Sequence, residues 1–343
     1  MTAARMTSAR QSWVDSAKAI GIVLVVYGHV ARGAVDAGAN HVPASFGLVD
    51  SVIYSFHMPL FFCLAGLFAA ASYERRGAGG MIVEKLLTVG VPYVVWSLVQ
   101  GLLEVWAGDL TNGSTGYRDV FALLWAPRSQ FWFLYALFLC FGLYVAARLL
   151  FARHGAIVLA TLALLLYFQY DAIYGARILP ALARSLVYFC FGVLCAALLR
   201  RRLPTGAGPL AVAAGVFIAA QYLFHGVLQL RHDDYGVAAL LLALVSIAVV
   251  AVAASAAANL ESRMLAAIGE ASMTIYVMHV IVGAGLRVFL MRVVGIDDFA
   301  VDVLLGVLAG VLVPLLTRSI ARGARVQGVA GAAIGIPRRA DAR

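Results

Sequence analysis

Residues 13–29 read WVDSAKAIGIVLVVYGH, an apolar run with a cation near its start and a histidine at its end. In one α-helix, the ten residues between Lys18 and His29 put both side chains within about 20° of one face and about 16 Å apart. Asp15 falls on the same stripe. A histidine inside the bilayer is costly and marks a functional site by default. The run therefore predicts a first membrane helix with a cation at one membrane face and a proton acceptor deeper in the bilayer.

The composition predicts a polytopic membrane protein, because 63% of the 343 residues are hydrophobic and only 13% are charged. An all-α bundle of about ten transmembrane helices is expected, since sheet edges exposed to lipid leave backbone groups unsatisfied. The expected spans are 18–35, 48–72, 81–106, 131–151, 155–171, 178–199, 209–229, 236–258, 265–289 and 300–320.

The basic residues predict the orientation of this bundle. With the N-terminus in the cytoplasm, most of the 26 lysines and arginines fall on the cytoplasmic side, and both termini lie there. This topology accounts for the net charge of +9, so no nucleic-acid partner is expected. We expect one membrane domain over residues 1–322 and a basic, disordered cytoplasmic tail over residues 323–343.

Three histidines are expected at similar depth in the outer half of the bilayer. His29 lies near the end of the first expected helix, His57 about a third of the way into the second, and His279 in the ninth. Pro59 beside His57 suggests local irregularity that lines a cavity. The alternative for each histidine is a hydrogen bond that only joins two helices. Their convergence favours a site, and we name all three as catalytic candidates.

Further polar residues accompany these histidines. Glu104 and Arg184 either pair with each other or line an acceptor pocket, and a short amphipathic or re-entrant piece is expected around residues 120–125. Trp132 fits a membrane-interface position. The four cysteines lie in apolar runs without metal-ligand spacing, so neither a metal nor a permanently bound cofactor is expected.

These motifs resemble a known family. The Lys18 to His29 run resembles the opening of the membrane acyltransferase-3 family, in which Arg or Lys precedes His by ten intervening residues. The run of residues 56–62, FHMPLFF, with Gly66, resembles the branch related to fucose 4-O-acetylases and exopolysaccharide O-acetyltransferases. Further motifs fit the same branch in order: Val91-Pro92-Tyr93 with Trp96, Phe131-Trp132-Phe133-Leu134, and Ser272 with Tyr276 and His279.

The resemblance covers residues 13–320, with two departures from the family pattern. Ala65 stands where a serine often precedes the glycine of the second motif. The basic cluster before the third helix is reduced to Glu84-Lys85, preceded by Arg75-Arg76.

The resemblance implies transfer of an acyl group, usually acetyl and not an amino-acyl group, from cytoplasmic acetyl-CoA to a sugar hydroxyl. The acceptor is a glycan or a lipid-linked sugar, and the expected location is a bacterial inner membrane. His29 would take the proton from the acceptor hydroxyl, while His57 or His279 orients His29 or donates to the oxyanion. Acetylation of His29 itself, in a two-step route, is equally compatible.

The remaining site residues divide between the two substrates. The donor would bind an inner-face group comprising Lys18, Asp15, Arg75, Arg76 and Lys85, in which the four cations hold the CoA phosphates. Lys18 has an alternative role as a structural partner of Asp15. The acceptor pocket would be lined by Glu104, Trp132, Arg184 and Tyr276. The competing class is a proton-coupled transporter of a lipid-linked sugar or small solute, because histidines within a membrane bundle also suit proton relays.

Overall fold

The described part of the chain is almost entirely helical. A computed structural model describes residues 3–108, 115–170, 178–199, 203–260 and 262–336. These residues contain no β-strand, only an isolated bridge between Asn40 and Asp298. Eight helical stretches within the same residues are long and apolar enough to cross a membrane. The expected all-α polytopic membrane bundle is therefore confirmed.

The chain divides into two compact units whose segments alternate along the sequence. The first unit comprises Met1–Gly21, Ser45–Ile82 and Leu139–Glu270, and the second comprises Ile22–Ala44, Val83–Phe138 and Ala271–Arg343. Helix α1 (Ala3–Asp36) contributes to both units, as does α6 (Trp132–Phe151). Asp15 and Lys18 therefore belong to the first unit, and His29 belongs to the second.

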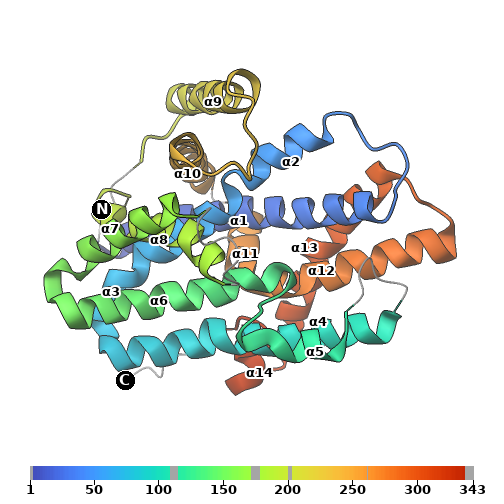
Figure 1. Cartoon of the computed structure of the whole chain (residues 1–343), viewed down its shortest axis with the longest axis horizontal. Helices are drawn as coiled ribbons and strands as arrows, with labels where there is room; N and C mark the ends of the chain where they lie inside the picture. The colour runs from blue at the N-terminus through green and yellow to red at the C-terminus, as the bar shows by residue number, and fades with distance from the viewer. Residues whose placement is uncertain (1–2, 109–114, 171–177, 200–202, 261, 337–343) are drawn as a thin grey trace. The chain divides into compact units, whose positions relative to one another are not determined.

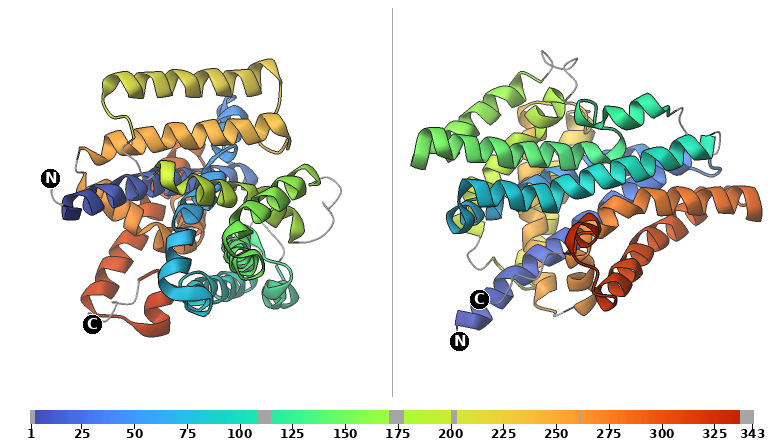
Figure 2. Two further views of the ribbon diagram at one scale, coloured as in Figure 1. Left: turned by 90° about the vertical axis from the view of Figure 1, so that its left-hand side faces the viewer. Right: turned by 90° about the horizontal axis from the view of Figure 1, so that it is seen from below.

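The helices of the first unit pack closely through small residues. A Cβ atom added to Gly66 would lie 2.0 Å from the carbonyl oxygen of Phe189, and one added to Gly192 would lie 2.1 Å from that of Cys63. Helices α3 and α8 therefore touch backbone to backbone, as is common for glycines in membrane bundles. Helices α9 and α10 form a hairpin (Figure 2). The elements of this unit include α2 (Phe46–Tyr54), α3 (His57–Lys85), α7 (Gly155–Phe168), α8 (Leu179–Leu199), α9 (Ala207–Tyr222), α10 (Val237–Ala258) and α11 (Arg263–Glu270).

The second unit is built around the C-terminal part of α1 and two long neighbouring helices, α12 and α13 (Figure 1). Valines of α1 fill the space left by glycines of α13: a Cβ on Gly306 would lie 2.6 Å from Val30 Cγ1, and one on Gly310 would lie 2.8 Å from Val26 Cγ1. The elements of this unit include a π-helical turn (Leu86–Gly90), α4 (Val91–Ala107), α5 (Tyr117–Phe121), α12 (Ser272–Phe289), α13 (Phe299–Gly323) and α14 (Gly328–Ala333).

Two of the eight membrane-length stretches are longer than one crossing requires. Phe46–Ala107 has 62 residues and Tyr117–Phe168 has 52, whereas about 20 residues span the hydrocarbon core. Gly77, at φ 69°, interrupts the first stretch, and Ala152, at φ 46°, separates α6 from α7 in the second. These breaks leave room for the ten crossings expected from hydropathy, of which α7 is the shortest at 14 residues.

Two expected helices are split in the structure. The 48–72 span is divided between α2 and α3, because Pro59 lies in the first turn of a new helix that begins at His57. Proline is tolerated there since the first N–H groups of a helix have no intrahelical partner. The 265–289 span is divided at Ala271 between α11 and α12. Gly269 at this break packs on α1, where its Cβ would lie 2.0 Å from the carbonyl oxygen of Asp15.

The segment that follows α1 is tied to the start of α13 within the second unit. Asn40 Nδ2 donates to Asp297 Oδ2 at 2.7 Å, and His41 Nδ1 lies 3.0 Å from Asp298 Oδ2. Asp298 also caps α13 by accepting from the N–H groups of Ala300 and Val301. The pKa of Asp298 lies below its ordinary value, mainly because the Val301 N–H stabilises the carboxylate, with a further contribution from His41.

The C-terminal segment differs from the disordered tail expected over residues 323–343. Helix α14 packs against α4, and Trp96 Nε1 donates to the Ala333 carbonyl at 2.8 Å. The Thr274 hydroxyl donates to the Ile334 carbonyl at 2.6 Å. These side chains give the tail backbone fixed partners, which composition alone does not reveal. Residues 337–343 lie outside the described residues.

Candidate active site

Two of the three predicted catalytic histidines meet in the second unit. The ring centroids of His29 on α1 and His279 on α12 lie 5.0 Å apart, with an interplanar angle of 72°. His279 is fully buried and His29 is half-buried. A Cβ on Gly310 of α13 would lie 3.6 Å from His279 Cβ, an ordinary van der Waals contact, so α13 packs directly beside this histidine. Three helices thus hold the imidazole pair.

Each of these imidazoles is oriented by the backbone of its own helix. His29 Nδ1 lies 2.9 Å from the Val25 carbonyl, and His279 Nδ1 lies 3.0 Å from the Ile275 carbonyl and 2.8 Å from that of Tyr276. A carbonyl only accepts hydrogen bonds, so these contacts assign the proton of each neutral ring to Nδ1. The lone pair is then on Nε2, the atom that can take a proton from a substrate.

Tyr276 links this pair to the start of α6. Its hydroxyl donates to the backbone carbonyl of Gln130, and its ring lies 6.0 Å from His279 and 5.3 Å from Phe133 between centroids. Trp132 is half-buried beside Phe133, with its ring centroid 6.4 Å away. The Tyr276 side chain is buried. Two of the predicted acceptor-pocket residues, Tyr276 and Trp132, therefore share a cluster, and Tyr276 extends it to His279.

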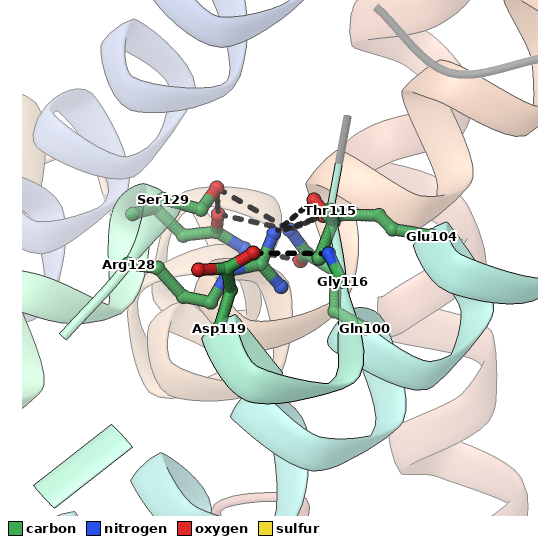
Figure 3. A network of polar contacts seen from close by, with 8 residues as sticks. Gln100, Glu104, Thr115, Gly116, Asp119, Arg128 and Ser129 are labelled. Atoms are coloured by element: carbon green, nitrogen blue, oxygen red, sulfur yellow. Dashed lines mark hydrogen bonds and ion pairs between the residues drawn. The ribbon is translucent and has the colours of Figure 1, made fainter. Parts of the chain in front are cut away.

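Glu104 forms the centre of a polar network near the C-terminal end of α4 (Figure 3). Its carboxylate pairs with Arg128, and Thr115 Oγ1 donates to Glu104 Oε2 at 3.0 Å. Gln100 Nε2 donates to the other carboxylate oxygen at 2.9 Å, and Gln130 Nε2 donates to Gln100 Oε1 at 2.7 Å. The ion-pair partner of Glu104 is thus Arg128, and the suggested pairing with Arg184 is not the one the structure describes.

The segment between Thr115 and Arg128 runs back along α4 and returns. Val120 packs on Gly101 of α4, because a Cβ atom added to this glycine would lie 2.9 Å from the methyl carbons of Val120. The Tyr93 hydroxyl donates to the Leu123 carbonyl. On α4, Gly101 and Tyr93 are about 12 Å apart along the axis. Thr115 and Arg128, at the two ends of this segment, both bind the Glu104 carboxylate. One side chain of α4 therefore holds the two ends of the segment together. The short piece predicted around residues 120–125 is therefore present.

Two other predicted residues belong to the first unit. His57 is buried, its Nδ1 lies 2.8 Å from the Ile53 carbonyl, and its ring centroid lies 4.5 Å from that of Tyr54. It therefore has the same proton arrangement as the other two histidines. Arg184 Nη1 donates to the Tyr235 hydroxyl at 2.9 Å.

The residues predicted to bind CoA are distributed over both units. Lys18 Nζ lies 3.2 Å from Asp15 Oδ1, so the alternative structural pairing is present. Arg75 and Arg76 are exposed immediately before the break at Gly77, also in the first unit. Lys85 belongs to the second unit, where its Nζ lies 3.7 Å from Glu84 Oε1.

Comparison with known proteins identifies the family. A family model described as an acyltransferase domain matches residues 11–318. The chain belongs to the acyltransferase-3 family. It is thus a membrane acyltransferase, and the match includes both the imidazole pair and the Glu104 network. No match is found among curated proteins or among solved structures.

Sequence reasoning missed several polar side chains that contact or neighbour the predicted residues, some in each unit. Gln100 and Gln130 form the amide pair beside Glu104, and Arg128 supplies its charge partner. Arg148 of the first unit stacks 4.9 Å from the Tyr73 ring centroid and donates to the Tyr144 hydroxyl at 3.2 Å. Gln100 is the residue that sequence could have signalled, because an amide four residues before Glu104 shares its helix face.

Proposed function

We propose that this acyltransferase moves an acetyl group from cytoplasmic acetyl-CoA to a hydroxyl of a cell-envelope glycan or lipid-linked sugar. The family match supports acyl transfer, and the motifs of residues 56–66 favour the branch related to sugar O-acetyltransferases. The proposed location is a bacterial inner membrane, with acetyl-CoA as a substrate and not a resident cofactor.

The proposal rests above all on the juxtaposition of His29 and His279. A general base must present an unprotonated nitrogen to the reacting hydroxyl, and the contact of Nδ1 with the Val25 carbonyl assigns the lone pair of His29 to Nε2. Histidine suits the task because its ordinary pKa is about 6.5. His279, 5.0 Å away between centroids, fixes the ring's position by packing against it.

In the proposed reaction His29 Nε2 takes the proton as the acceptor oxygen attacks the thioester carbonyl. The carbon–sulfur bond then breaks, the acetyl group remains on the sugar oxygen, and the CoA thiolate recovers a proton. In the two-step variant, His29 Nε2 attacks the thioester first and the sugar hydroxyl then attacks acetyl-histidine. Both routes give the same products, an acetyl ester and free CoA.

The donor would bind by its phosphates at basic side chains. Lys18, Arg75 and Arg76 carry the charge in the first unit, and Lys85 carries it in the second. Arg148 is an addition to this proposed group, since its guanidinium lies beside Tyr73, close in sequence to the two arginines.

The deciding experiment replaces His29 by alanine. Membranes that contain H29A and labelled acetyl-CoA should transfer label to glycan at least about 10²-fold more slowly than wild type, because a positioned base contributes 10²–10⁴-fold. The matched control is H154A, which removes an exposed histidine from the turn between α6 and α7. H29A protein that is present at wild-type level yet retains normal transfer would exclude His29 as base or acyl carrier.

The same assay separates the two routes and tests the competing class. Label retained on wild-type protein when glycan is omitted, and absent from H29A, supports acetyl-histidine. Label that enters vesicles without covalent transfer to glycan supports the transporter. Mass spectrometry of envelope glycans with and without the gene should show a loss of about 42 mass units for each acetyl group.

A further inference from the structure

A second pair of polar side chains, Arg287 and Asp302, lies along the same contact between α1, α12 and α13 as the imidazole pair. We call this three-helix contact the seam. On α12, His279, Gly283 and Arg287 follow one another at four-residue intervals and therefore share one face. On α13, Gly310, Gly306 and Asp302 do the same in the opposite chain direction.

Contacts with α1 fix the order of these positions along the seam. Gly310 lies against Val26, whereas Gly306 and Gly283 both lie against Val30. One turn further, Gly33 packs on Arg287, whose Nη1 would lie 2.4 Å from a Cβ atom at that glycine. Arg287 and Asp302 thus both lie two turns, or about 12 Å, from His279, toward the side that the charge distribution places outside.

The carboxylate of Asp302 lacks hydrogen-bond partners within the described residues. Its side chain is buried, with 5% of the residue exposed, and neither carboxylate oxygen accepts a hydrogen bond there. Arg287 lies within electrostatic range of Asp302 and also of Asp36 on α1. No hydrogen bond joins Arg287 to Asp302 within the described residues, so the acceptor sites of the carboxylate stay open although a guanidinium lies close enough to interact with it electrostatically. Buried polar groups are rarely left in this condition.

We propose that Asp302 and Arg287 bind hydroxyl groups of the acyl acceptor. A hydroxyl both donates and accepts, so it can satisfy Asp302 and face the guanidinium at the same time. An apolar group satisfies neither side chain, and a phosphate is repelled by the carboxylate. The polyhydroxylated surface of a sugar therefore fits the position best. This inference rests on the proposed function and assigns it an acceptor-recognition site.

The distance from His279 gives this site a distinct role. The hydroxyl held by Asp302 is not the one that reacts, because it lies about two helical turns from the imidazoles. Binding remote from the reacting bond aligns the acceptor and selects acceptors that carry the matching hydroxyl. Asp302 is thus a specificity-determining residue and takes no part in proton transfer.

The test compares D302N with wild type in detergent solution. The acceptor probe is a glycolipid extract from a strain that lacks the acyltransferase, and labelled acetyl-CoA is the donor. Asparagine keeps the shape of aspartate but removes its charge, so the apparent KM for the extract should rise about tenfold. The KM for acetyl-CoA should stay within about twofold of wild type. The matched control is L304A on α13, whose side chain is exposed.

A charge-swapped variant separates ligand binding from a purely structural ion pair. If Asp302 and Arg287 only stabilise the bundle, D302R/R287D should return both the melting temperature and the acceptor KM from the values of the single variants toward those of wild type. If they bind the acceptor, the swap leaves the acceptor KM raised even where it recovers stability.

The outcomes distinguish this inference from the function on which it rests. A wild-type protein that transfers no acetyl group to the extract overturns the proposed function. Active wild type together with a D302N variant of unchanged acceptor KM overturns the recognition site alone. Equal increases in the KM values for donor and acceptor also overturn it, because they indicate a general loss of structure.

Discussion

At the scale of single residues, the backbone carbonyl four residues before each histidine determines which ring nitrogen carries the proton. Val25 and Ile275 offer backbone carbonyls to the Nδ1 atoms of His29 and His279, and Ile53 does the same for His57. The helix itself thus directs a lone pair to Nε2 of each ring. Each of these contacts lies within one helix, whereas the meeting of His29 with His279 joins two helices and leaves no signal in the sequence.

The imidazole pair gives a prediction for His279. Its removal in H279A takes away the ring that packs against His29, so the base is positioned less well. We expect kcat to fall by roughly 10- to 100-fold, less than in H29A, with a nearly unchanged KM for acetyl-CoA. The measurement is initial-rate kinetics of acetyl transfer in reconstituted membranes. A kcat equal to that of wild type would show that His279 has no positioning role.

At the scale of elements, glycines determine how closely α1, α12 and α13 approach. The Gly306 Cβ position lies only 2.6 Å from Val30 Cγ1, closer than two carbon atoms can stand without a shift. The interval of four residues between Gly306 and Gly310 places both on the face toward α1. Hydropathy marks both helices as membrane spans but does not show that their glycines face one partner.

This packing predicts the effect of adding one methyl group. G306A should destabilise the solubilised protein by about 1–3 kcal/mol, because the added carbon overpacks the seam. V30A/G306A should recover part of that loss, since the shorter side chain returns space. Thermal unfolding in detergent measures both effects. The outer-face variant L308A is the control, since Leu308 is exposed on α13. Stability that G306A leaves unchanged would show that the seam relaxes freely.

At the scale of the whole molecule, the distribution of basic residues predicts that both termini lie in the cytoplasm. Peptide tags fused to the two ends should therefore resist protease added outside intact cells and be cleaved after lysis. A reporter inserted among residues 36–45, between α1 and α2, should show the opposite accessibility. Cleavage of either terminal tag in intact cells would contradict this topology.

The sequence by itself determined the helical membrane class, the first helix with Lys18 and His29, and the family motifs. These features depend on apolar run length and on spacing within single helices, which are local properties. The splits at Ser55–Phe56 and Ala271, and the anchoring of the tail by Trp96 and Thr274, came only from the structure.

Tertiary structure alone decided which polar residues meet. Glu104 and Arg128 lie on either side of a loop, and Arg287 and Asp302 approach each other from different helices, so neither proximity leaves a periodic signal in the sequence. Their partners depend on how α4 holds the returning segment and how α12 and α13 align on α1. Hydrophobic periodicity places a residue on a helix face, but packing against a neighbouring helix determines what that face meets.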